Sequence, residues 1–319
     1  MSTADVLVDA DLLVYKAGHA AQQVLWAVWP TEEEWRHEEP FKHGYWKRKG
    51  DAKNWVATHN KEGYIGYKVL PHKVSIAEDA IAFMKQKIVN LVISNTAHND
   101  AELNYYFSCK LDNNFRNKFP SVIPYKGNRA DLPKPYWKDV IIKDFFNDGP
   151  KIGLERDNDL EADDLIGIAA TEGKTFIRPI IASVDKDLNT IPGVHVNWDK
   201  ESVYWVDEEL ARMNFYKQVL TGDAADNIVG IKGIGDRRAS KILDSLANPT
   251  EEHLHQECTF KYMDYVKKKH MSSQHTSEII PEQTLELTAQ KWLNQNANLL
   301  WIQRYGREQW GRDEKTLHY

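Results

Sequence analysis

Two apolar runs of this chain each end in aspartates. The first covers residues 6–8 and is followed by Asp9, and the second covers residues 179–184 and is followed by Asp185 and Asp187. A short, continuous apolar run indicates a strand of a parallel sheet that is buried between helices on both faces. Residues that follow such strands meet at one edge of the sheet, where α/β proteins place their functional groups. The sequence therefore predicts an α/β fold, in which a central, mostly parallel sheet is flanked by helices and gathers acids at one edge.

Two more acidic motifs stand at predicted element boundaries. Glu161, Asp163 and Asp164 begin an apolar helical pattern, and Asp223 and Asp226 follow another helical pattern. An acid in the first turn interacts favourably with the helix dipole, so one of the first three could be a simple cap. Three acids within four positions exceed what a cap needs. Each motif alone is more often a solvated turn, whereas four of them at element boundaries indicate a single site.

The chemistry of such a cluster follows from the repulsion among its charges. Carboxylates packed together raise one another's pKa unless a cation neutralises them. Mg²⁺ and Mn²⁺ prefer carboxylate and water oxygens, and two such ions about 4 Å apart can hold the attacking and leaving oxygens of a phosphoryl displacement. A zinc site is not indicated, because the two cysteines, Cys109 and Cys258, are far apart and the 12 histidines show no ligand spacing. The predicted cofactor is a pair of Mg²⁺ ions, which Mn²⁺ can replace.

A glycine-rich stretch follows the last acids. Residues 230–235 read Gly-Ile-Lys-Gly-Ile-Gly, and the helical pattern behind them carries Arg237, Arg238 and Lys241. Glycines allow a tight turn whose backbone N–H groups approach phosphate oxygens, and a helix N-terminus favours an anion. The pattern predicts a helix-hairpin-helix that contacts a DNA backbone without reading its sequence. A glycine-rich turn between two packed helices is the alternative.

Five motifs together resemble the 5′→3′ exonuclease and flap-endonuclease family, and most of all its stand-alone bacteriophage members. They follow the order of the family and span about residues 4–27 and 100–245: VDADLLVY, FRNKFPSVIPYKGNR, LEADDLIG, SVDKDLNTI and TGDAADNIVGIKGIG. The resemblance implies a metal-dependent 5′ nuclease with an acidic site at the sheet edge. It implies these metal ligands: Asp9, Asp112, Glu161, Asp163, Asp164, Asp185, Asp187, Asp223 and Asp226.

The resemblance also implies which groups contact DNA. Residues 113–135 would form a helical arch, where Lys126 and Arg129 contact the scissile phosphate and the ring of Tyr125 stacks on a base. Arg116 belongs to the same catalytic set, and the basic groups would stabilise charge in the transition state. The hairpin would contact the duplex, with K⁺ as a further ion there. Its implied DNA-binding residues are Lys232, Gly233, Gly235, Arg237, Arg238 and Lys241.

Two positions depart from the family pattern. The family usually has an aspartate directly after its second strand, where this chain has Cys109, and the nearest acid is Asp112. Either Asp112 serves through an altered loop, or this ligand is absent. Asp11 stands where many relatives carry a small or hydroxyl residue. An additional ligand and a role outside the metal shell both stay open for it.

Length and charge fit one large or two modest domains. For 319 residues with a net charge of −6, we expect a nuclease core over residues 1–206, with an inserted segment at 29–73, and a helix-hairpin-helix module over 207–319. No stretch approaches the roughly 20 apolar residues of a membrane span, and Met1 leads into a predicted strand rather than a signal peptide. We expect a cytoplasmic monomer, in the host cytoplasm if a phage encodes it.

Hydrophobic periodicity predicts most of the remaining elements. The expected helices cover residues 12–28, 76–91, 137–146, 208–220 and 284–304, and the expected strands cover 103–108, 151–154, 194–198 and 202–206. Residues 29–73 match no part of the family core. Their aromatic and basic side chains suit a hairpin subdomain that stacks on single-stranded nucleic acid. Compact packing of the tryptophans is the alternative.

These inferences predict a 5′→3′ exonuclease and structure-specific flap endonuclease. Its substrate would be DNA with a 5′ end or a 5′ flap, and the RNA strand of RNA–DNA hybrids is a further candidate. Three alternatives stay open. A haloacid-dehalogenase-type phosphotransferase would use Asp9 as a nucleophile, a PIN-type ribonuclease would share the acidic sheet edge, and a non-catalytic DNA-binding protein would have lost part of the metal site.

Overall fold

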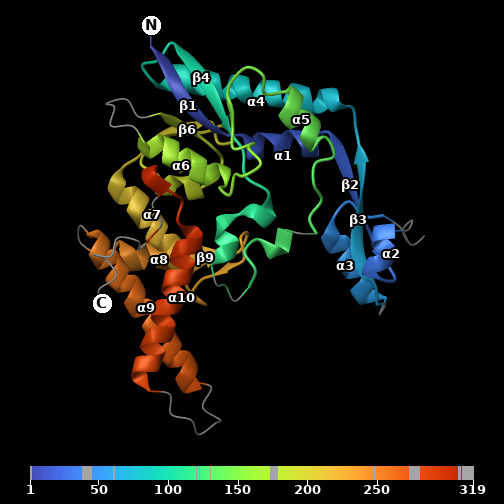
Figure 1. The fold of residues 1–319 in the computed structure, drawn as a ribbon. Coiled ribbons are helices and arrows are strands. Elements are labelled where there is room, and N and C mark those ends of the chain that lie inside the picture. The colour runs from blue at the N-terminus through green and yellow to red at the C-terminus, as the bar shows by residue number, and fades with distance from the viewer. Residues whose placement is uncertain are drawn as a thin grey trace. The chain divides into compact units, whose positions relative to one another are not determined.

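A computed structural model describes most of the chain, which groups into two compact units (Figure 1). The described residues are 2–37, 45–59, 62–119, 121, 123–129, 131–172, 179–246, 249–272, 281–307 and 310. Unit 1 consists of Met1–Ala10, Ile88–Ala130 and Gly149–Tyr319, and unit 2 consists of Asp11–Lys87 and Asp131–Asp148. The division into a core and a C-terminal module at residue 206 stays a prediction.

Unit 1 contains a six-stranded sheet in the order β5-β4-β1-β6-β7-β8. Its strands are β1 (Thr3–Asp9), β4 (Asp100–Tyr106), β5 (Lys151–Ile152), β6 (Ile180–Ala182), β7 (Gly193–Asn197) and β8 (Ser202–Val206). All neighbours are parallel except β8, which runs antiparallel to β7. The prediction of a mixed α/β fold with a largely parallel central sheet is therefore confirmed. Asp9 pairs with Tyr106 at the ends of β1 and β4, so the carboxyl ends of the central strands share one edge.

Helices of unit 1 enclose two hydrophobic cores. The helices are α6 (Ala162–Glu172), α7 (Glu208–Thr221), α8 (Asp236–Leu243), α9 (Glu251–Ser272) and α10 (Glu282–Leu300). The first core joins Ile166 of α6 to Leu7 and Ile181 of the sheet, and Ile302 packs there from the segment after α10. The second core lies among α7, α8, α9 and α10. The predicted helices at 208–220 and 284–304 are observed, although α10 ends at Leu300.

A sharp turn follows α7. The side chain of Asp207 caps the start of this helix by accepting a hydrogen bond from the Leu210 N–H at 2.7 Å. Gly222 ends the helix with φ +68°, and a Cβ there would lie 2.3 Å from the Gly230 nitrogen. Glycine is therefore required at this turn. The turn continues into the short antiparallel pair β9 (Gly222–Asp223) and β10 (Ile228–Val229).

Unit 2 is built around a two-stranded antiparallel ribbon. The prediction of a helix over residues 12–28 is wrong in its second half, because α1 (Ala10–Ala20) is followed by strand β2 (Gln22–Trp29). This segment is rich in β-formers, and its partner β3 (Tyr64–Pro71) lies some forty residues further along the chain, so local periodicity could not reveal the pairing. The other helices here are α2 (Glu32–His37), α3 (Lys49–Thr58) and α5 (Lys138–Asp144), together with the first part of α4 (Val74–Asn95), which passes into unit 1 at Ile88.

The tryptophans of the 29–73 segment pack against other rings. Trp46 lies 5.6 Å from Trp55 between ring centroids, and Trp35 lies 5.0 Å from Tyr64 and 5.4 Å from Tyr67. The packing alternative therefore describes these tryptophans. Strand β3 of this segment pairs with β2, which precedes the segment, rather than with a strand of the expected hairpin. Residues 38–44, 60 and 61 of this segment lie outside the described part.

The predicted arch has a different local structure from the one expected. Among its described residues, which leave out 120, 122 and 130, the elements are short 3-10 turns at Phe115–Lys118 and Gly127–Arg129 rather than an α-helix. The predicted helices at 76–91 and 137–146 are observed as α4 and α5. No helix in the described parts of the chain is long and apolar enough to cross a membrane.

Candidate functional site

Carboxylates gather at the carboxyl edge of the central strands. Asp9 ends β1 and is 4% exposed, and Asp185 follows β6. Ser183 connects the two segments, because its hydroxyl donates to Asp9 Oδ2 at 3.0 Å and accepts from the Asp185 N–H at 3.0 Å. Parallel pairing of β1 with β6 brings these residues together, as the sequence predicted.

Asp163 lies where the negative charges of this edge converge. It belongs to the first turn of α6, and the backbone N–H that precedes it, of Ala162, donates to the hydroxyl of Ser108 at 2.9 Å. Burial raises the pKa of Asp163 well above its usual range, and the charges of Asp9, Asp185 and Glu161 raise it further. As the side chains are placed, no group of three or more Asp, Glu, His or Cys within the described residues forms a ready-made metal cage. The cluster therefore concentrates negative charge around Asp163.

Asp187 and Asp223 extend the cluster toward α7. Burial, together with the charges of Asp185 and Asp223, raises the pKa of Asp187 to about 8. Gln218 of α7 donates from Nε2 to Asp187 Oδ1 at 2.5 Å, and the Asp187 N–H donates to Asp185 Oδ1 at 2.9 Å. The end of β6 and the end of α7 are thus joined through carboxylate oxygens.

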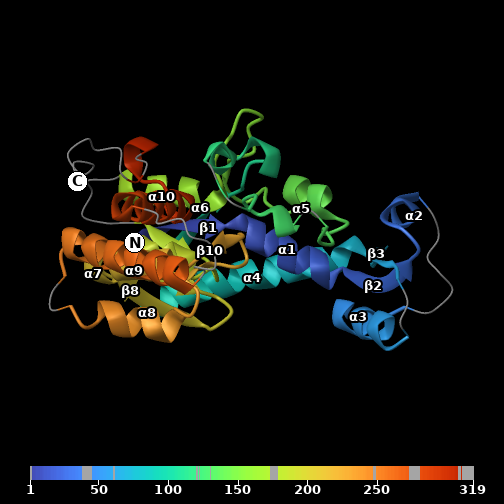
Figure 2. The same cartoon turned by 90° about the horizontal axis from the view of Figure 1, so that it is seen from below.

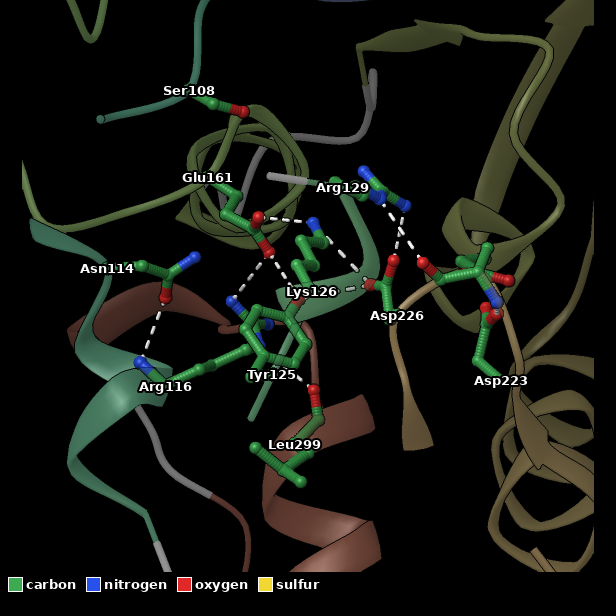
Figure 3. A network of polar contacts seen from close by, with 12 residues as sticks. Ser108, Asn114, Arg116, Tyr125, Lys126, Arg129, Glu161, Asp223, Asp226 and Leu299 are labelled. Carbon is green, nitrogen blue, oxygen red and sulfur yellow. Dashed lines mark hydrogen bonds and ion pairs between the residues drawn. The ribbon is translucent and has the colours of Figure 1, made fainter. Parts of the chain in front are cut away.

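Glu161 has the opposite environment. Its carboxylate forms an ion pair with Lys126 and accepts from Arg116 Nη1 at 3.2 Å and from the Tyr125 hydroxyl at 2.7 Å (Figure 3). Burial alone would raise the pKa of Glu161, but Lys126 and Arg116 hold it down to about 2. Glu161 is therefore an anion at neutral pH, in contact with two cations.

Lys126 lies between two carboxylates, Glu161 and Asp226 (Figure 3). Its Nζ is 3.5 Å from Asp226 Oδ2, and Arg129 pairs with the other oxygen of the same carboxylate. The backbone supports this arrangement, because the Lys126 N–H donates to the Asp226 carbonyl at 3.0 Å. The basic loop and the loop after α7 therefore form one network.

Tyr125 has a different environment from the one the resemblance implied. Its ring is 7% exposed and belongs to the helical core of unit 1. Its hydroxyl lies 2.7 Å from Glu161 and 3.1 Å from Asp226, so it connects the two acids that hold Lys126. In this arrangement the ring is not open for a base to stack on it, and we assign the residue a positioning role.

Arg116 and Asp164 form a buried ion pair. The guanidinium is 3% exposed and donates to both oxygens of Asp164, at 2.6 and 2.8 Å. It also donates to the carbonyls of Leu299 and Trp301, at 2.9 and 2.8 Å, and Asp164 accepts from the N–H groups of Glu161 and Gln303. Such a guanidinium has no donor facing a phosphate, and both oxygens of Asp164 are occupied by protein groups. These contacts favour a supporting role for the pair over the predicted roles of Arg116 in catalysis and of Asp164 as a metal ligand.

The first departure from the family pattern concerns Cys109 and Asp112, and the second concerns Asp11. Asp112 is exposed in a short 3-10 turn, Leu111–Asn113. Cys109 is half-buried beside the acidic motif, and its N–H donates to the Leu160 carbonyl at 2.8 Å. Burial and the charges of Glu161 and Asp164 raise the pKa of the Cys109 thiol to about 12. The position thus holds a neutral thiol where the family pattern has a carboxylate. Asp11 lies in the first turn of α1.

The glycine-rich stretch forms a turn with one buried side and one exposed side. Ile231, Ile234 and Ala239 are buried in the helical core. Gly233 has φ +87°, and Gly235 is the N-cap residue of α8. The predicted DNA-binding residues are exposed on the other side: Lys232, Gly233, Gly235, Arg237, Arg238 and Lys241.

Sequence reasoning missed four residues that orient the acids. Ser183, Gln218, Ser108 and Gln303 each form a hydrogen bond with a site carboxylate or with the first turn of α6. Ser183 could have been found from the sequence, because it is the first residue of the strand-end motif SVDKDLNTI. The others are polar residues of ordinary type whose role depends on packing between distant segments.

Comparisons with known proteins give distant similarities. No family model matches the chain. A DNA polymerase I from Caldicellulosiruptor bescii is 28% identical over 150 residues, which are 40% of this chain and 17% of the polymerase. The chain thus spans less than a fifth of the length of that relative.

Among solved structures, the T5 5′-exonuclease with bound zinc is 15% identical, with a TM-score of 0.44 over 94% of this chain and 89% of that chain. A bacteriophage T5 flap endonuclease in a complex with DNA and metal ions is 16% identical, with a TM-score of 0.36 over 66% of this chain and 90% of that chain. The chain thus has distant similarity to T5 5′-exonuclease structures and to part of a DNA polymerase I.

The buried Arg116–Asp164 pair makes a prediction about stability. Arg116→Met should lower the free energy of unfolding by about 3–5 kcal/mol, because it leaves the buried carboxylate of Asp164 without a cation. The measurement is urea denaturation followed by circular dichroism. The control is Lys268→Met, which removes an exposed ion pair with Asp264 and should cost less than about 1 kcal/mol. Equal losses in the two variants would contradict the assignment.

The raised pKa of Asp187 makes a prediction about pH. In the folded protein this carboxyl keeps its proton up to about pH 8, whereas its ordinary value is 3.8. Stability of the metal-free protein should therefore fall as pH rises from about 4 to about 8, because unfolding releases that proton. Melting temperatures in EDTA should fall less steeply across this range in Asp187→Asn than in wild type. The exposed-site control Asp112→Asn should keep the wild-type slope, and a wild-type slope in Asp187→Asn would refute the prediction.

Proposed function

We propose that this chain is a metal-dependent nuclease that hydrolyses DNA phosphodiesters at or near 5′ ends and 5′ flaps. The single observation that carries the proposal is the acidic cluster around Asp163, bordered by a loop that presents Lys126 and Arg129. Such a site offers carboxylate oxygens for hard cations and side-chain cations for phosphate within one network. The similarity to T5 5′-exonuclease structures points to the same class of activity.

The cluster fits a divalent metal ion by its chemistry. Burial and mutual repulsion raise the pKa of Asp163 and Asp187, which is the condition that a bound cation relieves. The donor atoms are carboxylate oxygens, and Mg²⁺ and Mn²⁺ prefer these. Two Mg²⁺ ions would supply an activated water and stabilise the leaving 3′ oxygen. The residues that would hold the ions or their waters are Asp9, Glu161, Asp163, Asp185, Asp187, Asp223 and Asp226.

Lys126 and Arg129 would exchange partners during binding. In the structure both cations are neutralised by Glu161 and Asp226, two of the proposed ligands. Carboxylates that hold a cation would attract Lys126 and Arg129 less strongly. Lys126 and Arg129 would then be available to the scissile phosphate, where their positive charge would stabilise the transition state. The protein would thus present its phosphate-binding cations only once its acids are neutralised.

Tyr125, Arg116 and Asp164 would act by positioning. The Tyr125 hydroxyl fixes the orientation of Glu161 and Asp226, and Arg116 fixes Glu161 against the first turn of α6. Rotamers held by packing and hydrogen bonds keep a site close to its productive geometry. None of the three needs to touch the substrate in this account.

The turn at residues 230–235 and the first turn of α8 would form a helix-hairpin-helix that contacts duplex DNA. Ile231 and Ile234 anchor the turn in the core, while the basic side chains of α8 stay exposed. Backbone N–H groups and basic side chains would meet a phosphate there without reading bases. K⁺ at this turn and the RNA strand of RNA–DNA hybrids as a second substrate belong to the same proposal, as does action as a monomer in the cytoplasm.

The metal site is tested by removing one ligand charge at a time. Glu161→Gln or Asp163→Asn should lower the single-turnover cleavage rate of 5′-flap DNA at least roughly a hundredfold at limiting Mg²⁺, because each removes charge that holds the ions. DNA affinity, measured in EDTA, should stay measurable in both variants. Asp112→Asn is the matched control and should keep its rate, because its carboxylate is exposed outside the cluster.

Retained wild-type turnover in either cluster variant would refute the assignment. Wild-type protein that binds flap DNA without cleaving it at any Mg²⁺ or Mn²⁺ concentration would instead support the non-catalytic alternative. A covalent phosphoenzyme trapped on Asp9 would support the phosphotransferase.

The hairpin is tested by a binding measurement. Arg237→Ala/Arg238→Ala should weaken binding equally on all duplex sequences and lower the slope of log affinity against log salt by about one for each lost phosphate contact. The single-turnover rate at saturating DNA should change little, because these residues lie outside the acidic network. An unchanged affinity and an unchanged salt slope would return residues 230–235 to the role of a packed turn.

A further inference from the structure

Unit 2 separates its charges onto two sides of the β2–β3 ribbon. Helices α2 and α3 lie on opposite sides of the ribbon in both views (Figures 1 and 2). Residues 46–58, which include α3, contain four Lys or Arg and one Asp, although the whole chain has a net charge of −6. Helix α2, by contrast, begins with three glutamates, of which Glu32 and Glu33 are exposed. An excess of positive charge is therefore concentrated on the side of α3.

The backbone that carries this positive charge is held firmly. Trp46 adds to the edge of β2 through two hydrogen bonds with Trp26, 2.7 and 2.8 Å long. Trp46 packs on Trp55 of α3, and Ala52 of α3 is fully buried. The ammonium of Lys49 lies 5.0 Å from the centroid of the Trp26 ring. Residues 46–55 therefore have a fixed conformation before any ligand binds.

The cations between these anchors face outward. Lys47, Arg48 and Lys53 are exposed, and none of them forms an ion pair with a residue in the described part of the chain. The neighbouring exposed positions of α3 include the acid Asp51 and the uncharged residues Gly50, Asn54 and Ala57, so the cations outnumber the acid on this helix. Unpaired cations beside small side chains let an extended anion approach the helix closely. We call Lys47, Arg48, Lys49 and Lys53 the α3 basic face.

The other side of the ribbon is held just as closely but has the opposite charge. Trp35 of α2 donates from Nε1 to the Tyr67 carbonyl at 3.1 Å. A Cβ added to Gly66 would lie 2.2 Å from the Trp35 ring, so this helix sits directly on β3. Both helices are packed tightly on the ribbon, but they carry opposite charge. We take the positive charge on the α3 side to indicate a polyanionic partner.

We propose that the α3 basic face binds the phosphate backbone of nucleic acid, as a contact surface separate from the acidic cluster and from the hairpin at 230–235. A row of cations on a backbone that is already held by packing suits a polyphosphate chain, because each neutralised phosphate releases counterions and the backbone loses little freedom on binding. The contact is independent of base sequence, since its aromatic side chains are used for packing. The proposal takes DNA as the polymer from the proposed function, but it does not require cleavage.

The test combines a footprint with a titration. Lysine acetylation read by mass spectrometry, in EDTA with and without 5′-flap DNA, should show protection of Lys47 and Lys53. Arg48→Gln/Lys53→Gln should weaken binding of the same DNA on the order of tenfold at low salt and lower the salt slope by about two. The single-turnover rate at saturating DNA should stay at the wild-type value.

The matched control removes the same charge elsewhere. Lys200→Gln/Lys291→Gln neutralises two exposed lysines of unit 1 and should leave affinity and salt slope near wild type. If the two double variants changed DNA affinity and salt slope equally, the loss of net charge alone would explain the effect, and the proposal would be overturned. Absence of protection at Lys47 and Lys53 would also overturn it. A different result would contradict the proposed nuclease function, namely wild-type protein that binds DNA but does not cleave it.

Discussion

Repulsion among buried carboxylates is the constraint around which unit 1 is arranged. Asp163 and Asp187 lie in environments that favour their protonated forms, because burial and neighbouring acids disfavour the charge. Glu161 escapes this effect only because Lys126 and Arg116 neutralise it. The folded chain therefore keeps a local charge imbalance that a divalent cation could relieve. We interpret this imbalance as the physical basis of metal binding and, through Lys126, of phosphate binding.

The acidic edge depends on a segment far from it in sequence. The end of α10 and the chain after it bring the carbonyls of Leu299 and Trp301 to Arg116, and the N–H of Gln303 to Asp164. The first turn of α6 is thereby fixed from two sides. A buried ion pair contributes little net stability compared with an apolar pair, but it is costly to break and so enforces one arrangement. The C-terminal helices and the sheet edge thus depend on each other.

Much of the fold followed from the sequence, because buried parallel strands and their terminal acids are local signals. The strands that end at Asp9 and Val206 and the helices over 76–91 and 208–220 are examples. The β2 strand was misassigned because its partner β3 is distant in the chain. The surroundings of Tyr125 and Arg116 could not be predicted, since burial and partners such as Leu299 depend on tertiary packing. A motif alone therefore does not show whether a residue contacts the substrate or positions another side chain. That distinction needs the structure.

The most direct test of the metal-binding account is an anomalous diffraction experiment on crystals grown with excess Mn²⁺. The account predicts anomalous peaks within coordination distance of the carboxylates of Asp163 and neighbouring acids. It also predicts that the Lys126 ammonium is displaced from Glu161. A map without a peak in the acidic cluster, in which Lys126 still pairs with Glu161 at saturating Mn²⁺, would contradict it.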